Sequence, residues 1–98
     1  MIVETRFEWD DRKAASNFRK HGIRFTAALQ VFRDPLAVTV QDRVQCNEPR
    51  WQTIGLADEG VLLLVAHTIS NEKDGSEVVR IISARRAEPK ERRRYEQG

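Results

Sequence analysis

The chain has 98 residues, 40% of them hydrophobic and 33% charged, with a formal net charge of +2 at pH 7. This length predicts one domain, residues 1–98, with a single modest core. The longest apolar run, 61–66, is too short to cross a bilayer, and the opening MIVETRFEWDD lacks the basic start and apolar run of a secretory signal. The single cysteine, Cys46, excludes an intrachain disulfide. We therefore expect a soluble, cytoplasmic protein with no contact to a membrane.

The first third of the chain predicts a strand followed by two helices. Residues 2–9 alternate in polarity, which is typical of a half-buried strand. Asp10, or the aspartate after it, can cap a first helix, and Gly22 can end it because glycine readily adopts a left-handed conformation. A second helix is expected from Thr26, whose hydroxyl can cap it, and its end is expected before Pro35.

The rest of the chain predicts four consecutive strands and a short helix. β-Branched and polar residues alternate, and turn-forming sequences occupy 57–60 and 71–75. This order is typical of an α+β fold in which the helices cover one face of an antiparallel β-meander and leave the other face open. The expected elements are strands at 37–44, 50–56, 61–68 and 77–84, and a helix from Pro89 to about Tyr95.

Positive charge is concentrated near the C-terminus. Residues 85–94 hold six basic side chains against two acidic ones, a local charge of +4 that leaves −2 for the other residues. Such a patch attracts a polyanion even when the total charge is small. A solvated helix face is the alternative interpretation. The six side chains are Arg85, Arg86, Lys90, Arg92, Arg93 and Arg94.

Four side chains of the predicted strands are candidates for catalysis. Arg50 enters the second strand of the meander, His67 ends the third, and Arg80 and Arg85 belong to the last. Because such ends lie close together in a meander, we expect the four side chains to converge on one patch. Strict alternation would place Arg80 on the side of Ala84 and Arg85 on the opposite side, so the pattern does not decide which face carries the patch.

This combination of residues suits RNA cleavage. Arginine binds phosphate through two hydrogen bonds and stays charged, so it stabilises a pentacoordinate transition state. Histidine can take the 2′-hydroxyl proton or protonate the leaving 5′-oxygen. The sequence contains no HExxH, CxxC or Gly-rich phosphate loop. It therefore predicts chemistry without a metal or another cofactor.

Each candidate also has a structural interpretation. His67 can be a hydrogen-bonded core histidine, His21 a cation placed at a helix C-terminus, and Tyr95 a side chain that packs its helix down. An arginine inside an apolar strand needs a partner. For Arg80 that partner is a phosphate or a glutamate, with three candidates in Glu4, Glu8 and Glu48. On the residues alone, an enzyme and a simple nucleic-acid binder are not separable.

Four blocks carry a resemblance that runs in order over nearly the entire chain. They are FEWDDRKAASNFRKHGIRFTAALQVFRDP (7–35), EPRWQTIG (48–55), LLVAHT (63–68) and VRIISARRAEPKERRRYE (79–96), with KHG and RIISAR the most distinctive parts. Together they resemble the BrnT family of type II toxin–antitoxin toxins. The resemblance implies a RelE-like fold and a metal-independent endoribonuclease that inhibits translation and growth. It also implies neutralisation by a BrnA-like antitoxin in a heterotetramer, which binds promoter DNA only through the antitoxin.

The resemblance also implies roles for individual residues. Arg80 and Arg85 are expected to clamp the phosphate and its transition state. Arg50 is expected to position the substrate, and His67 is the candidate acid–base group. Four further residues are expected to bind substrate, namely Lys20, His21, Arg86 and Tyr95.

Two other interpretations remain open at this stage. One is a non-catalytic module that binds nucleic acid or protein through the same arginines. The other is a decayed toxin that is kept as a co-repressor subunit. The second interpretation arises because many family members place an arginine shortly after the third strand of the meander, where this chain has Ile69, Ser70 and Asn71.

Overall fold

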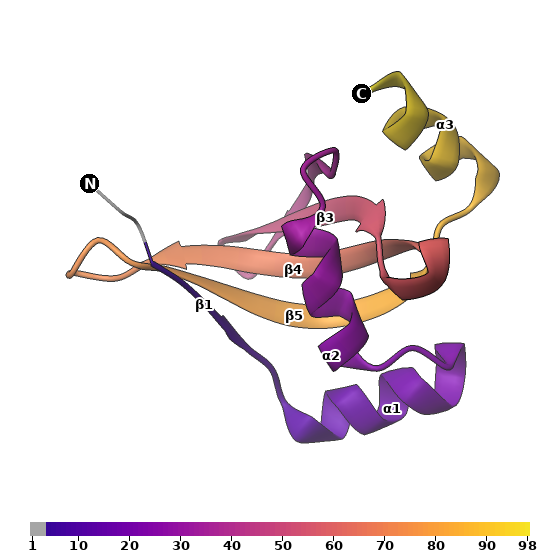
Figure 1. Ribbon diagram of the computed structural model, residues 1–98. Helices are drawn as coiled ribbons and strands as arrows, with labels where there is room; N and C mark the ends of the chain where they lie inside the picture. The colour runs from indigo at the N-terminus through magenta and orange to yellow at the C-terminus, as the bar shows by residue number, and fades with distance from the viewer. Residues whose placement is uncertain (1–3) are drawn as a thin grey trace.

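A five-stranded sheet forms the centre of the protein, which a computed structural model describes over residues 4–98 (Figure 1). The strand order is β1-β5-β4-β3-β2, with β1 parallel to β5 and all other pairs antiparallel. The predicted meander is confirmed, and residues 2 and 3 of the first predicted strand lie outside the described residues. The strands are β1 (Thr5–Glu8), β2 (Val38–Gln45), β3 (Glu48–Leu56), β4 (Leu62–Asn71) and β5 (Glu77–Arg86).

Three helices and two 3-10 segments surround the sheet. The middle helix crosses one face of the sheet, and the C-terminal helix lies apart from the other two (Figure 1). The α+β class and the short C-terminal helix are thereby confirmed. Within residues 4–98, none of the helices is long and apolar enough to cross a membrane. The segments are α1 (Asp11–His21), α2 (Phe25–Ala28), η1 (Leu29–Arg33), η2 (Asp58–Gly60) and α3 (Pro89–Gln97).

Each face of the sheet carries its own apolar cluster. On the first face, which we call the helix face, α2 and η1 bury Phe25, Ala28 and Val31 against residues of β4 and β5. On the opposite face a smaller cluster packs against α3, and it consists of Ile54, Leu62 and Leu64 with Ala87 and Tyr95. Among residues 4–98, α3 is thus the helix that packs on the opposite face, and it reaches one end of it (Figure 1).

Local sequence signals explain most of the helix ends. Asp10 caps α1 by accepting from the backbone N–H groups of Arg12 (2.8 Å) and Lys13 (3.3 Å), and Gly22 ends it with φ 71°. The predicted cap at Thr26 is wrong. The helical turn begins earlier, with backbone bonds to the Arg24 carbonyl, because the following Phe25 is buried in the core.

Gly55 allows η1 to lie directly on β3. A Cβ atom at this position would come within 2.9 Å of Val31 Cγ1 and 3.0 Å of the Val31 carbonyl oxygen. Cβ atoms in proteins essentially never approach other heavy atoms closer than 3.0 Å. The close approach therefore depends on glycine, and it fixes η1 against β3.

A β-bulge in β5 changes which side chains share a face. Ala66 of β4 lies opposite Ser83, but its neighbour His67 lies opposite Ile81, so Ile82 is an extra residue without an opposite partner. An extra residue shifts the alternation of a strand by one position. Two residues of β5, one before and one after Ile82, therefore lie on the same face when their residue numbers differ by an odd number.

The bulge places Arg80 and Arg85 on the same face of the sheet. Arg80 lies opposite Thr68, and Arg85 lies opposite Leu64, which belongs to the cluster under α3. Ala84 lies in the core of the helix face instead. The expectation from strict alternation, that Arg80 shares the side of Ala84, is wrong because the extra residue intervenes.

Asn17 of α1 holds the edge of β5 next to the bulge. β1 pairs with residues 77–80 of β5, and beyond Arg80 this edge of β5 has no neighbouring strand within the described part of the chain. The Asn17 side chain accepts from the Ala84 N–H (3.0 Å) and donates to the Ala84 carbonyl (2.9 Å) and the Ile23 carbonyl (3.0 Å). A buried amide side chain thus replaces the missing strand and satisfies backbone groups that would otherwise lack partners.

Removal of this clamp should destabilise the fold. Asn17→Ala leaves the buried N–H and carbonyl of Ala84 unpaired, and we expect the free energy of unfolding to fall by about 2 to 4 kcal/mol. Urea denaturation followed by circular dichroism measures the change. Ser16→Ala, at the exposed neighbouring position of α1, is the control and should stay within about 0.5 kcal/mol of the unsubstituted chain. Equal stabilities for the two variants would show that Asn17 does not hold the β5 edge.

Candidate functional site

Three arginines from two strands lie on the face opposite α2. The bulge places Arg80 and Arg85 there, and the alternation of β3 adds Arg50, because the adjacent Trp51 lies opposite His67 on the helix face. Gln52 follows two residues after Arg50 and lies on the same side. We call this surface the arginine face and define it by Arg50, Gln52, Arg80 and Arg85.

Arg50 carries an unsatisfied hydrogen-bond donor. Its Nε atom is buried and finds no hydrogen-bond partner among residues 4–98. A buried donor of this kind costs about 1 to 3 kcal/mol, and more in a charged group. The side chain is only half-buried, so its remaining atoms face solvent. The Nε atom itself is out of contact with solvent, so an anion can meet Arg50 only at the exposed part of its side chain.

Arg85 is held in place by a carboxylate of α3. Its Nη1 and Nη2 atoms donate to Glu91 at 2.9 and 2.7 Å, and the Glu91 side chain is buried. Glu91 also accepts from the backbone N–H of Glu88 (2.7 Å) in a capping box at the start of α3. The bidentate contact fixes the plane of the guanidinium on the arginine face.

The same contacts shift the ionisation of both groups. Burial alone would raise the pKa of Glu91, but hydrogen bonds from Arg85 and from the Glu88 backbone lower it below its ordinary value of 4.5. The hydrogen bond with Glu91 raises the pKa of Arg85 further. Both groups therefore stay charged at neutral pH, and the ion pair connects α3 to the sheet.

Arg80 has a weaker partner. Its Nη1 atom lies 3.7 Å from Glu8 of β1, and both side chains are half-exposed. Of the three glutamates that the sequence offered as partners, Glu8 is the one in contact. Exposed ion pairs contribute under about 1 kcal/mol, so a phosphate can compete for this guanidinium.

Two hollows border the arginine face. One, of about 320 Å³, lies between α3 and the sheet, and its lining is Asp42, Gln52, Arg85, Lys90, Glu91 and Arg94. The other, of about 160 Å³, lies at the bulge, and its lining is Lys13, Ser16, Asn17, Lys20, His21, Ile82 and Ser83. The bulge hollow thus brings Lys20 and His21 next to Ser83, which shares the face of Arg85. Within residues 4–98, no three His, Cys, Asp or Glu side chains form a group that could hold a metal ion.

His67 does not join the arginines. It is 1% exposed and lies on the helix face, where its ring meets Phe32 edge to face at 5.0 Å between centroids. Its Nε2 atom is hydrogen-bonded to Thr53 Oγ1 (2.7 Å), which in turn contacts Thr39 Oγ1 (2.9 Å). The expected convergence of His67 with Arg50, Arg80 and Arg85 is wrong, because β4 turns the His67 side chain away from their face.

Burial determines the ionisation of His67. Desolvation lowers its pKa below the ordinary value of 6.5, and the Thr68 carbonyl near Nδ1 (3.4 Å) only partly opposes this effect. The ring is therefore neutral at pH 7. Its neutral nitrogen atoms suit the Thr53 hydroxyl and the apolar surroundings, as the structural interpretation of this residue requires.

The structure gives two further candidates, Tyr95 and Arg86, other surroundings than the sequence predicts. Tyr95 donates its hydroxyl to Asp34 (2.6 Å) and packs on the cluster under α3, so it fixes the helix. That hydrogen bond raises the pKa of Tyr95 and lowers the pKa of Asp34. Arg86 lies opposite Leu63, a core residue of the helix face, and so belongs to the other side of β5. Tyr95 therefore lies on the same side of the sheet as Arg85 with its hydroxyl engaged by Asp34, whereas Arg86 lies on the opposite side.

The fold and its basic sheet face define a small α+β protein suited to binding a polyanion. A family model described as "Ribonuclease toxin, BrnT, of type II toxin-antitoxin system" matches residues 9–91. The chain therefore belongs to the BrnT family of ribonuclease toxins, and the family assignment from the sequence is confirmed. The description implies an antitoxin as partner and RNA as substrate.

A solved structure supports the same fold. The crystal structure of the Brucella abortus ribonuclease toxin BrnT matches with a TM-score of 0.60 and 23% sequence identity, over 88% of this chain and 99% of that chain. At this identity the likeness shows the fold alone. No curated protein matches the chain.

The buried state of His67 predicts how stability depends on pH. The unfolded chain takes up a proton on His67 near pH 6.5, whereas the folded chain does not, so the free energy of unfolding should fall as the pH drops below 6.5. The loss approaches about 1.4 kcal/mol per pH unit at its steepest. His67→Gln retains a hydrogen-bonding group for Thr53 and should give a flatter profile. Urea denaturation between about pH 7.5 and 5.5 tests this, with the exposed His21→Gln as control. Parallel profiles for His67→Gln and the unsubstituted chain would contradict it.

Proposed function

We propose that this chain is a metal-independent endoribonuclease that cleaves RNA on the arginine face. The observation that carries the proposal is the alignment of Arg50, Arg80 and Arg85 on one side of the sheet, produced by the bulge at Ile82. Three guanidinium groups on one surface match the charge that a phosphodiester develops during cleavage. We further propose that cleavage takes place in the cytoplasm, on translated RNA, and so inhibits translation and growth.

The proposed reaction needs no external nucleophile. The 2′-oxygen of a ribose attacks the adjacent phosphorus, the bond from phosphorus to the 5′-oxygen breaks, and the products carry a 2′,3′-cyclic phosphate and a 5′-hydroxyl. The 2′-hydroxyl proton passes to a base, and an acid supplies the proton of the leaving 5′-oxygen. Arg80 and Arg85 neutralise the pentacoordinate transition state, and the exposed part of the half-buried Arg50 side chain supplies positive charge beside a neighbouring phosphate.

The acid–base role falls to His21 rather than His67 in this proposal. His67 is buried on the other face, whereas His21 is exposed in the bulge hollow with Lys20 and Ser83. An imidazole at this edge can exchange protons with a ribose held on the arginine face. His67, with Thr53, then supports the sheet beneath the site.

Arg6 offers a cation where the sequence lacks the arginine that many relatives have after the third strand of the meander. Ser70 lies opposite Val78 across β4 and β5, and Val78 lies opposite Arg6 of β1. Ser70, Val78 and Arg6 therefore lie side by side across β4, β5 and β1. Val78 precedes Arg80 by two residues, so the row is next to that of Arg80 on the same face. Arg6 contacts Glu72 at 3.7 Å through an exposed ion pair, which a phosphate can replace. This row favours a working toxin over a decayed one.

The proposed partner is a BrnA-like antitoxin. Membership in a family of type II toxins supports a protein that binds the toxin and neutralises it. We propose that the two proteins form a heterotetramer and that promoter DNA is bound through the antitoxin. The arginine face is then left to RNA.

A non-catalytic binding module is the second candidate function. The Arg80–Glu8 and Arg85–Glu91 contacts favour it, because both guanidinium groups already have partners without RNA. The two functions differ in what happens to bound RNA: a nuclease shortens it, and a binder retains it intact with an affinity that falls steeply with salt.

RNA cleavage by the purified protein in excess EDTA tests the proposed function. We expect discrete fragments with 2′,3′-cyclic phosphate ends, and a rate that falls about 100-fold or more in Arg80→Ala and in Arg85→Ala. Arg33→Ala, an exposed arginine of η1 on the helix side, is the matched control and should keep the rate. Intact RNA with the unsubstituted chain, or full activity in both arginine-face variants, would contradict the proposal.

A further inference from the structure

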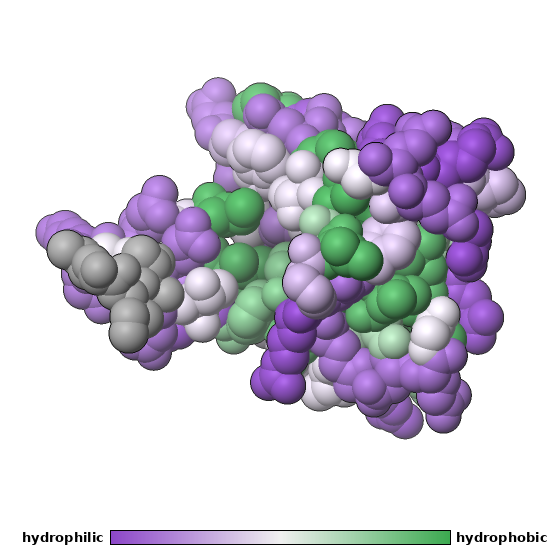
Figure 2. Space-filling view, turned by 45° about the horizontal axis from the view of Figure 1, so that its top comes forward, coloured by the Kyte–Doolittle hydropathy of each residue, from purple (hydrophilic) through white to green (hydrophobic). Residues whose placement is uncertain are grey.

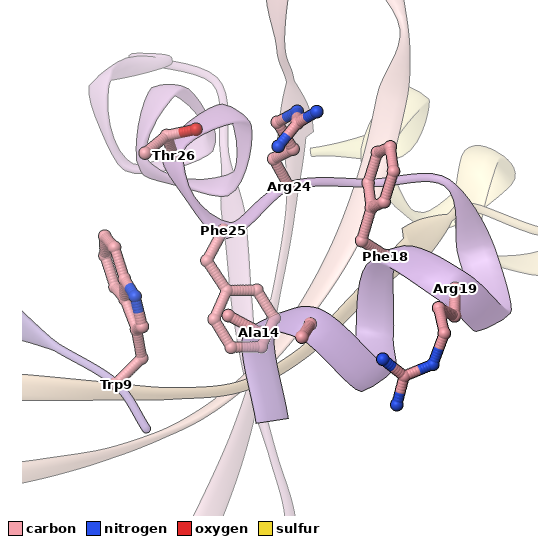
Figure 3. A pocket seen from close by; sticks show the side chains of 8 residues that line it. Trp9, Ala14, Phe18, Arg19, Arg24, Phe25 and Thr26 are labelled. Atoms are coloured by element: carbon pink, nitrogen blue, oxygen red, sulfur yellow. The ribbon is translucent and has the colours of Figure 1, made fainter. Parts of the chain in front are cut away.

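An apolar groove lies between α1 and α2, away from the arginine face. It has a volume of about 420 Å³, and Figure 3 shows Phe25 at its centre between Trp9 and Phe18. The Trp9 and Phe25 rings pack edge to face, with 6.0 Å between centroids. On the side that carries α1 and α2, apolar side chains reach the surface between hydrophilic ones (Figure 2). The full lining is Trp9, Ala14, Ala15, Phe18, Arg19, Arg24, Phe25 and Thr26.

Phe18 is the exposed aromatic residue among those that line this groove. Its side chain is 41% exposed, although it occupies the same helix as the buried Asn17. The Arg24 guanidinium lies 4.3 Å from the centroid of the Phe18 ring, and Arg19 borders the groove on α1. The groove therefore combines an aromatic floor with two cations at its rim.

The groove is separate from the proposed RNA site. α1 has one flank on each: Lys13, Ser16 and Lys20 line the bulge hollow, whereas Ala14, Phe18 and Arg19 line the groove. None of the residues that define the arginine face contributes to the groove. A ligand can thus occupy the groove without contact with the arginines on the sheet.

We propose that this groove binds the antitoxin, through an apolar side chain inserted over Phe25 and carboxylates that pair with Arg19 and Arg24. The inference rests on the proposed function in one respect, that the chain has an antitoxin partner. Aromatic side chains with arginine at the rim are typical of the few contacts that dominate protein–protein affinity. The two cations require an acidic partner segment.

The lining favours a protein over a nucleobase. Besides the two arginines, it offers only the Thr26 hydroxyl and the Trp9 indole N–H as side-chain hydrogen-bonding groups. Recognition of a base edge needs several donors and acceptors in fixed positions. An aliphatic or aromatic side chain needs none, and it would cover the exposed Phe18 ring.

The location of the groove also suggests how a partner bound there affects the arginine face. α1 carries Asn17, which holds β5 at the bulge, and it carries Lys20 and His21 at its C-terminal end. A partner seated in the groove packs against this same helix. A segment that continues past the end of α1 reaches Lys20 and His21 and blocks the bulge hollow.

Isothermal titration calorimetry of the purified chain with a BrnA-like antitoxin tests the inference. Phe18→Ser removes the aromatic surface and Arg24→Glu reverses a rim charge, and we expect each to weaken binding about 30-fold or more. Both positions are exposed, so unchanged melting temperatures should accompany the loss. The controls are Leu36→Ser, at a 69% exposed leucine outside the groove, and Arg33→Glu; both should bind within about twofold of the unsubstituted chain.

A fluorescence titration gives a second readout. In a Trp51→Phe background Trp9 is the one remaining tryptophan, and antitoxin binding should shift its emission because it lines the groove. Unchanged affinity in both groove variants, or no binding by the unsubstituted chain, would overturn the inference. Variants that lose RNA cleavage while they keep antitoxin affinity would assign the groove to RNA and also overturn it. The affinity is measured between purified proteins and does not depend on RNA cleavage. The binding test can therefore be interpreted even if the chain proves to be an inactive nuclease.

Discussion

The hydrogen bonds from Asn17 to Ala84 secure the part of the sheet on which the site depends. β1 pairs with the first half of β5 and leaves the outer edge of its second half uncovered within the described part of the chain. At the same place, the bulge at Ile82 interrupts the pairing of the other edge with β4. Without the amide clamp, this edge would have unpaired backbone groups next to an irregular register. With the clamp, the bulge is fixed, and Arg80 and Arg85 stay on one face although five positions separate them.

The three arginines on this face differ in how strongly they are held by other side chains. Arg85 is tied to the buried Glu91, Arg80 to the exposed Glu8 at longer range, and the Nε of Arg50 has no partner within the described part of the chain. The contact with Glu91 orients the Arg85 guanidinium, the contact with Glu8 is easily exchanged, and the buried Nε leaves Arg50 with an unsatisfied donor. α3 contributes Glu91 to the arrangement and is itself held by Tyr95 and Asp34. The C-terminal helix is therefore part of the site and not an appendage to it.

Sequence patterns predicted the elements well and the site only in part. Periodicity, the cap at Asp10 and the stop at Gly22 act locally, so the order of helices and strands could be derived from them. The face that Arg80 and Arg85 share could not be derived in this way, because nothing local marks Ile82 as the extra residue. The prediction that His67 joins the arginines was wrong for a related reason. Alternation places His67 and Thr68 on opposite faces, but only the position of α2 decides which face is covered. Glu91 was missed because its contact with Arg85 depends on the path of the chain between β5 and α3.

The most direct test of the account is a map of the surface that RNA contacts. A short 2′-O-methyl oligoribonucleotide cannot be cleaved through its 2′-oxygen, so it can be titrated into isotope-labelled protein and followed by NMR. The account predicts that chemical-shift changes concentrate on Arg50, Arg80, Arg85 and the bulge at Ile82, while residues of the α1–α2 groove stay unperturbed. Changes centred on Phe18 and Arg24, with the arginine face unaffected, would contradict it.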